Sequence, residues 1–228
     1  MRWTKWTLAA LVVSGVAVAP VAGQQAPPAP QARFVVVLDA AHGGDETGGR
    51  LADSQFEKTF TLALTMRLRS LLGARGIQVV TTRESDAAVA PERRAEIANH
   101  AAAQACLSLH ASESGSGIHL FVSSLAPVQP VRFPAWKTAQ GASVSRSLKL
   151  AGVVNSALLQ AGISTTLART TLPVVDSMSC PAVAVEIAPE RSALHETTAG
   201  LGDPDYQARV AAALAAALVE WRTEAHQP

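Results

Sequence analysis

Four residues with the chemistry of a metal-dependent hydrolase occur far apart in the sequence, and they are His42, Glu57, His110 and Glu186. His42 comes soon after an apolar run, residues 34–38, and two glycines follow it. His110 closes a second apolar segment, and Glu186 lies near the end of a third. Two neutral imidazoles and one carboxylate form a catalytic zinc set that leaves one position for water. The second carboxylate would then serve as the general base.

Taken one at a time, these residues also fit structural roles. Glu57 begins a helical apolar pattern, where a carboxylate complements the helix dipole. His110 also fits the structural role of a core histidine that is held by hydrogen bonds. Glu186 is different, because an acid within an apolar strand is costly unless it is paired or bound to a metal. The four residues together therefore indicate a metal-dependent active site more strongly than any one of them does.

Hydrophobic periodicity predicts the elements that would position these side chains. Apolar, β-branched runs bounded by Gly or Pro indicate strands, and apolar residues at helical spacing indicate helices. The expected strands are 34–38, 77–82, 106–110, 118–123 and 181–187, and the expected helices are 57–75, 92–105, 143–161 and one from Pro204 onward. Segment 125–140 is expected to be a surface loop, and 163–178 a short strand and a loop. Strands that alternate with helices predict a three-layer α/β domain with a mostly parallel sheet. Parallel neighbours would bring all four side chains to one edge of that sheet.

Composition limits the class of protein. The chain has 228 residues, of which 48% are hydrophobic and 16% charged, so it is long enough and apolar enough to bury one ordinary core. Its formal net charge is only +1, and it has one Tyr and five Phe. Neither a basic surface nor stacking platforms for bases are indicated, so we expect no nucleic-acid partner.

The N-terminal segment has the layout of a secretory signal peptide, which we expect to be residues 1–23. Basic residues come first, an apolar stretch follows, and small residues close the segment. An uncleaved membrane anchor is the alternative. Residues 24–32 form a Pro-rich linker, and the catalytic domain is expected to cover 33–225. After cleavage we expect an exported protein, in the periplasm or cell-wall space, without stable membrane insertion. The two cysteines, Cys106 and Cys180, are allowed to form a disulfide there, but their spacing does not show that they meet.

Six segments in order resemble the zinc-dependent N-acetylmuramoyl-L-alanine amidases: VVVLDAAHGGDETGG, Glu57-Lys58, QVVTTRESD, RAEIAN, LSLHAS and PAVAVEIA. The resemblance implies a twisted, mainly parallel sheet flanked by helices. It also implies that His42, Glu57 and His110 bind one Zn²⁺ per chain and that Glu186 is catalytic. The implied reaction is hydrolysis of the amide between N-acetylmuramic acid and L-alanine in peptidoglycan, with the need for a protein activator left open.

Two other functions stay open beside this one. A zinc peptidase that cuts within the stem peptide would use the same metal chemistry. A non-catalytic homologue would bind peptidoglycan without cutting it, although such proteins typically lose a ligand or the base.

Departures from the family pattern lie close to these motifs. Ala41 stands where the family usually has Gly, and Glu46 where it commonly has Asp, and we expect neither to touch a ligand. Gly43 and Gly44 are expected to make a turn that leaves room at the metal. Segment 125–150 is too short and Pro-rich for the regulatory helix that some members carry.

Three further residues receive structural interpretations. Arg83 is expected in an ion pair, Asn99 is expected to tie a helix to a loop, and His119 is expected to be structural rather than a fourth ligand.

Overall fold

A six-stranded sheet forms the middle layer of the computed structural model, which describes residues 33–130 and 135–225. The strand order is β2–β1–β3–β6–β4–β5. The strands are β1 (Val35–Ala40), β2 (Gln78–Thr81), β3 (Ala105–Ala111), β4 (Ile118–Ser123), β5 (Thr165–Thr170) and β6 (Ala182–Ile187). β2, β1, β3 and β6 are mutually parallel, β4 runs antiparallel to β6, and β5 is parallel to β4. Residues 35–38 of β1 are all apolar, as is typical of a parallel strand with both faces buried, and Asp39 is the one charged residue of this strand.

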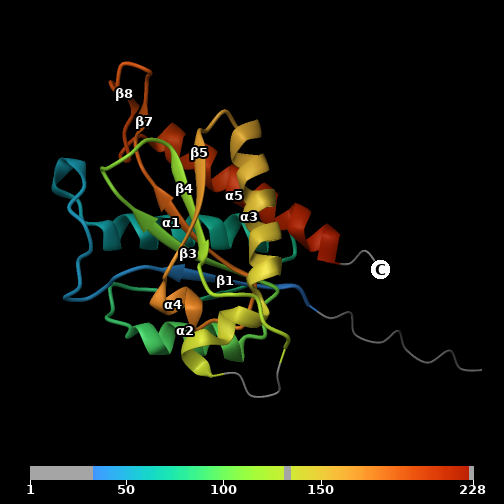
Figure 1. Ribbon diagram of the computed structural model, residues 1–228. Helices are drawn as coiled ribbons and strands as arrows, with labels where there is room; N and C mark the ends of the chain where they lie inside the picture. The colour runs from blue at the N-terminus through green and yellow to red at the C-terminus, as the bar shows by residue number, and fades with distance from the viewer. Residues whose placement is uncertain (1–32, 131–134, 226–228) are drawn as a thin grey trace, which may run out of the picture. The chain divides into compact units, whose positions relative to one another are not determined.

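Helices cover both faces of the sheet, which makes the three-layer fold predicted from the sequence (Figure 1). The larger hydrophobic cluster packs α1 (Glu57–Gly73), α3 (Val144–Gln160) and α5 (Pro204–Ala225) on one face. The smaller cluster packs α2 (Pro91–His100) and the short α4 (Pro173–Asp176) on the other. The 3-10 segment η2 (Trp136–Ala142) adjoins α4, and a shorter one, η1 (Ala52–Ser54), precedes α1. None of the helices in the described part of the chain is long and apolar enough to cross a membrane.

α1 illustrates how the periodic pattern becomes structure. Phe60, Leu64, Leu68 and Leu72 recur at intervals of four and are all buried against the sheet. Gly76, with a φ of 72°, follows the helix and lets the chain turn into β2.

The expected helix over residues 92–105 is five residues too long at its end. α2 stops at His100, and Ala102 has a φ of 47°. Pairing with β1 overrides the helical propensity of the alanines, because the chain must turn here to enter β3. The uncertain segment 163–178 contains β5 and α4, and a small hairpin of β7 (Glu190–Arg191) and β8 (Thr197–Ala199) was not expected. The expected signal segment 1–23 and linker 24–32 lie outside the described residues.

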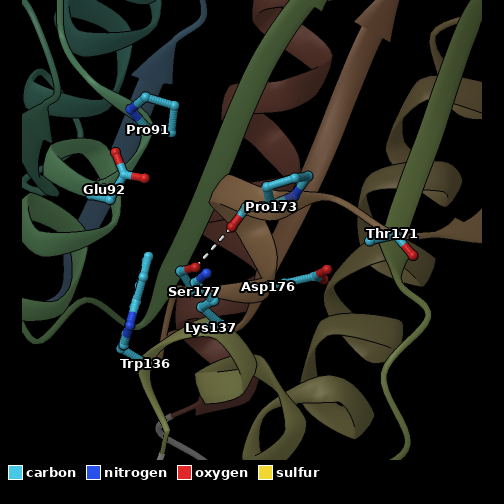
Figure 2. Close-up of a pocket in the computed structure, with 8 residues that line it drawn as sticks. All are labelled: Pro91, Glu92, Trp136, Lys137, Thr171, Pro173, Asp176 and Ser177. Atoms are coloured by element: carbon cyan, nitrogen blue, oxygen red, sulfur yellow. Dashed lines mark hydrogen bonds between the residues drawn. The ribbon is translucent and has the colours of Figure 1, made fainter.

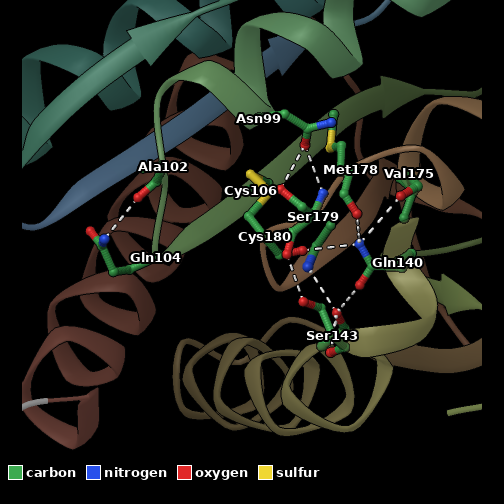
Figure 3. Close-up of a disulfide and its surroundings, with 12 residues drawn as sticks. Asn99, Ala102, Gln104, Cys106, Gln140, Ser143, Val175, Met178, Ser179 and Cys180 are labelled. Atoms are coloured by element: carbon green, nitrogen blue, oxygen red, sulfur yellow. Dashed lines mark hydrogen bonds between the residues drawn. A yellow bond between two sulfur atoms is a disulfide. The ribbon is translucent and has the colours of Figure 1, made fainter. Parts of the chain in front are cut away.

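Cys106 and Cys180 form a disulfide, which answers a question that their spacing left open (Figure 3). The bond joins the start of β3 to the segment that leads into β6. Beside it, the Gln140 side-chain amide donates hydrogen bonds to the carbonyls of Val175, Met178 and Cys180. These contacts attach η2 to the segment that carries the disulfide.

Asn99 ties the end of α2 to the same segment, as predicted. Its Nδ2 donates to the Ser177 carbonyl at 3.0 Å, and its Oδ1 accepts from the Ser179 amide at 2.7 Å.

Candidate metal centre and active site

His42, Glu57 and His110 meet at the carboxyl ends of β1 and β3. Glu57 Oε2 lies 3.1 Å from His42 Nε2, and Glu57 Oε1 lies 3.0 Å from His110 Nδ1. The two imidazole rings are nearly perpendicular, with centroids 5.6 Å apart. One potential ligand atom from each residue lies within 4.8 Å of the others, so this trio could hold a metal ion.

Different backbone features deliver the three side chains. His42 lies two residues after the end of β1 and has a left-handed backbone, with a φ of 62°. His110 is the second-last residue of β3, and Glu57 is the first residue of α1. Burial opposes ionisation of Glu57, yet hydrogen bonds from His110, His42 and the backbone amides of Gly49 and Ala111 hold its pKa well below its usual range. The hydrogen bond with Glu57 in turn raises the pKa of His42.

The expectation that Gly43 and Gly44 leave room at the metal is wrong. A Cβ on Gly43 would lie 2.3 Å from the Ala87 carbonyl oxygen, and one on Gly44 would lie 2.8 Å from the Ala88 amide nitrogen. Both glycines also have positive φ angles, of 137° and 63°. They let the turn after His42 pack closely against the loop before α2.

Gly48 is the residue that leaves room beside the ligands. A Cβ on Gly48, whose φ is 67°, would lie 2.6 Å from His42 Cδ2 and 2.7 Å from Glu57 Oε2. The neighbouring Gly49 would bring its Cβ only to 3.5 Å from Glu57 Oε2, an ordinary contact. Nothing in the sequence distinguished Gly48 from the other glycines, because the contact depends on the path of the loop.

The second nitrogen of each histidine is also engaged. His42 Nδ1 lies 3.1 Å from Glu46 Oε1, so the expectation that Glu46 touches no ligand is wrong. His110 Nε2 lies 3.4 Å from Ser108 Oγ, and Ser108 Oγ donates to Asp39 Oδ2 at 2.7 Å. The spacing Ser-x-His on one strand could have pointed to Ser108, since alternate residues share a face.

Two buried arginines support the end of β1. Arg83 Nε donates to the Ala40 carbonyl at 3.0 Å and its Nη2 to the Ala41 carbonyl at 3.1 Å. Among the described residues Arg83 forms no salt bridge, so the expected ion pair is wrong, and carbonyl oxygens take its place. Burial lowers the pKa of Arg83. The ion pair belongs to Arg94, whose Nη1 lies 2.7 Å from Asp39 Oδ1 with both side chains buried.

Glu186 lies beside His110 in the parallel pairing of β3 with β6. Residues in register on neighbouring strands are about 4.8 Å apart and present their side chains to the same face. Glu186 is half-buried, and across the antiparallel pairing with β4 its partner is His119. His119 Nδ1 lies 2.7 Å from the Thr166 hydroxyl. Glu186 therefore lies next to His110 in the sheet, and both side chains are on the sheet face that the smaller hydrophobic cluster covers.

A separate hollow of about 300 Å³ lies between α2, η2 and α4 (Figure 2). Pro91 and Glu92 of α2 form one wall, and Trp136 and Pro173 contribute to the others. None of the four predicted site residues lines it, so this hollow does not belong to the metal centre.

The donor set fits zinc. Two imidazole nitrogens and a carboxylate oxygen converge, both histidines have a hydrogen-bond partner on the nitrogen that faces away, and Gly48 provides space beside them. Three protein ligands of these types are those of catalytic zinc sites, and partners of this kind are typical for metal-binding histidines.

Comparison with known proteins gives one consistent family. The family model described as N-acetylmuramoyl-L-alanine amidase matches residues 36–220. The germination-specific N-acetylmuramoyl-L-alanine amidase of Bacillus subtilis is 33% identical over 90 residues, which are 33% of this chain and 38% of that protein. N-acetylmuramoyl-L-alanine amidase AmiA of Escherichia coli is 39% identical over 77 residues, which are 34% of this chain and 27% of that protein.

Solved structures support the same fold. The catalytic domain of CwlV, an N-acetylmuramoyl-L-alanine amidase from Bacillus (Paenibacillus) polymyxa var. colistinus, superposes with a TM-score of 0.65 at 26% identity. The superposition covers 83% of this chain and 98% of that domain. The alignments with the curated relatives, in contrast, span well under half of the length of those proteins.

Proposed function

Because the chain belongs to the family of N-acetylmuramoyl-L-alanine amidases, we propose that it hydrolyses the amide between N-acetylmuramic acid and L-alanine in peptidoglycan with the help of zinc. The observation that carries the proposal is the convergence of His42, Glu57 and His110, with Glu186 in register beside His110. Export to the periplasm or cell-wall space is part of the proposal, since the substrate is located there. The signal-like pattern of residues 1–23 and the disulfide of the folded domain support it.

His42 and His110 would hold the metal as neutral imidazoles, and Glu57 as a carboxylate. The low pKa of Glu57 keeps it ionised at any physiological pH. A zinc ion held there supplies Lewis acidity, which activates water and polarises the scissile carbonyl. The backbone amides of Gly49 and Ala111, which donate to Glu57 at 2.9 and 3.1 Å, keep the carboxylate in place.

Glu186 would transfer the proton. As water adds to the lactyl carbonyl carbon, the Glu186 carboxylate accepts a proton from it as general base. The carbon–nitrogen bond then breaks, and Glu186 delivers that proton to the amine nitrogen of L-alanine. The products are a lactyl carboxylate on the glycan and a stem peptide with a free N-terminus.

Two measurements on the purified chain test this proposal. Metal analysis should find one zinc per chain, and mass spectrometry of digested sacculi should find whole stem peptides released from the glycan. Fragments cut within the stem peptide would instead identify a zinc peptidase, and zinc-loaded protein without products would identify a binding homologue. Comparison of the turnover with and without an unheated extract of cells that lack the gene for this protein decides whether an activator is needed.

Glu186→Gln tests the role of the base. The variant should bind zinc like the wild type and lose at least about a hundredfold in turnover, the lower range for loss of a general base. Glu220→Gln, an exposed position on α5, is the matched control and should keep full activity. Undiminished turnover in Glu186→Gln would contradict the assignment.

A further inference from the structure

A chain of hydrogen bonds leads from the metal trio into the protein interior. We propose that Asp39, acting through Ser108, is a positioning residue that fixes the His110 ring so that its Nδ1 is the ligand atom. Ser108 Oγ lies 3.4 Å from His110 Nε2 and donates to Asp39 Oδ2 at 2.7 Å. This inference rests on the proposed function and deepens it, because it assigns a role to Asp39 and Ser108, which are not among the proposed metal ligands.

Asp39 is held rigidly by its other contacts. It is 1% exposed, and its Oδ1 accepts from Arg94 Nη1 at 2.7 Å and from the Thr82 hydroxyl at 2.8 Å. A buried carboxylate is tolerated only when it is paired and fully hydrogen-bonded, and these contacts meet that condition. Asp39 therefore cannot turn away from Ser108 without leaving a buried charge unsatisfied.

The direction of these bonds determines the tautomer of His110. An ionised carboxylate only accepts hydrogen bonds, so the hydroxyl proton of Ser108 is committed to Asp39. Ser108 Oγ then offers only lone pairs to His110 Nε2, and that nitrogen must carry the proton. Nδ1, which faces Glu57 Oε1 at 3.0 Å, is then the nitrogen left to a metal ion, and metal binding would replace its hydrogen bond to Glu57.

His42 uses the opposite nitrogen for the same reason. Its Nδ1 faces the Glu46 carboxylate at 3.1 Å, which leaves Nε2 toward Glu57. Arg94 connects the two histidines, since it pairs with Asp39 and also donates from Nη2 to the His42 carbonyl at 2.7 Å. The two sides differ in exposure, because the Glu46 side chain is 69% exposed whereas Asp39 and Ser108 are buried. The rigid constraint thus acts on His110.

Substitution of Ser108 tests the network by metal affinity rather than by turnover. Loss of such an outer partner typically weakens metal binding about 10- to 100-fold. Ser108→Ala should show this loss in zinc competition with a chromophoric chelator, and a changed visible spectrum when Co²⁺ replaces zinc. Ser108→Thr, which keeps the hydroxyl, should recover most of the affinity.

Ser147→Ala is the matched control. Ser147 is also fully buried and its hydroxyl donates to Gln140 Oε1 at 2.6 Å, but it lies on α3 and takes no part in the contacts of Asp39 or His110. This variant should lose stability and keep the zinc affinity of the wild type within about threefold, well below the 10-fold lower bound expected for loss of an outer partner. An equal loss of zinc affinity in both variants would show that any destabilisation of the core weakens metal binding, and it would overturn the inference. So would wild-type affinity and an unchanged cobalt spectrum in Ser108→Ala.

The tautomer can also be measured without any variant. Long-range ¹H–¹⁵N correlation spectra of the zinc-loaded wild type should show His110 with its proton on Nε2 and His42 with its proton on Nδ1. A proton on Nδ1 of His110 would overturn the inference even if Ser108→Ala fails to fold. A wild type that binds no zinc would instead overturn the proposed function, which separates the two failures.

Discussion

Removal of the Cys106–Cys180 disulfide should destabilise the domain without damaging the metal centre. The two cysteines are 74 residues apart in the sequence, so the bond closes a large loop. On the chain-entropy model a loop of this size stabilises the folded state by about 4 kcal/mol, because the unfolded chain loses conformational freedom. That is a large share of the 5–15 kcal/mol that is typical of a whole domain.

The location of the disulfide predicts that activity survives. Cys106 precedes His110 by four residues along β3, which corresponds to about 13 Å. We therefore expect Cys106→Ala/Cys180→Ala to bind zinc and turn over peptidoglycan like the wild type at temperatures where it stays folded. Alanine is the appropriate replacement, since both sites are buried and a serine hydroxyl would lack a partner.

Equilibrium unfolding in guanidinium chloride measures the effect. With a slope of about 4 kcal/mol per M, a loss of about 4 kcal/mol moves the midpoint down by about 1 M. All samples contain a chelator, so that metal binding does not contribute, and wild type reduced with dithiothreitol should unfold like the double variant. A loss below about 1 kcal/mol would refute the loop-entropy argument. Loss of zinc binding in the folded variant would refute the claim that the disulfide and the metal centre are independent.

Three further predictions follow from the trio and the core. Gly48→Ala should weaken zinc binding by about tenfold or more, the scale of losses when metal ligands are no longer held in position, because its Cβ would lie 2.6 Å from His42 Cδ2 and 2.7 Å from Glu57 Oε2, whereas Gly49→Ala should bind zinc normally in the same competition assay. In metal-free protein the lowered pKa of Glu57 contributes stability above pH 4.5, and the raised pKa of His42 contributes it below pH 6.5. The guanidinium chloride midpoint of the wild type should therefore exceed that of Glu57→Gln most between pH 4.5 and pH 6.5, and the difference should shrink at lower and at higher pH. A difference that does not change with pH would contradict this. Leu68→Ala, at a fully buried position of α1, should lower the free energy of unfolding by about 2–5 kcal/mol in the same titration.

The elements of the fold were predictable where a local pattern decides them. The period-four apolar residues of α1 and the continuous apolar run of β1 each bury a surface that the sequence alone defines. The end of α2 was not predictable in this way. Residues 101–105 have good helical propensity, and only the pairing of Ala105 with Val36 draws them into the sheet.

The interpretation of single polar residues failed more often, and for one physical reason. Arg83 was expected to pair with an acid and instead donates to carbonyls, while Glu46 was expected to touch no ligand and lies against His42. A polar side chain takes whichever partner the fold places within about 3 Å, and sequence distance carries no information about that.

The sequence by itself determined the three-layer class and the four residues of the proposed site, because strand ends and residue chemistry are local properties. Only the tertiary structure decided which atoms of those residues face one another. It placed Gly48 beside the ligands, and it connected His110 through Ser108 to the buried Asp39. These contacts join segments up to 69 residues apart, and their geometry depends on how the strands stack in register.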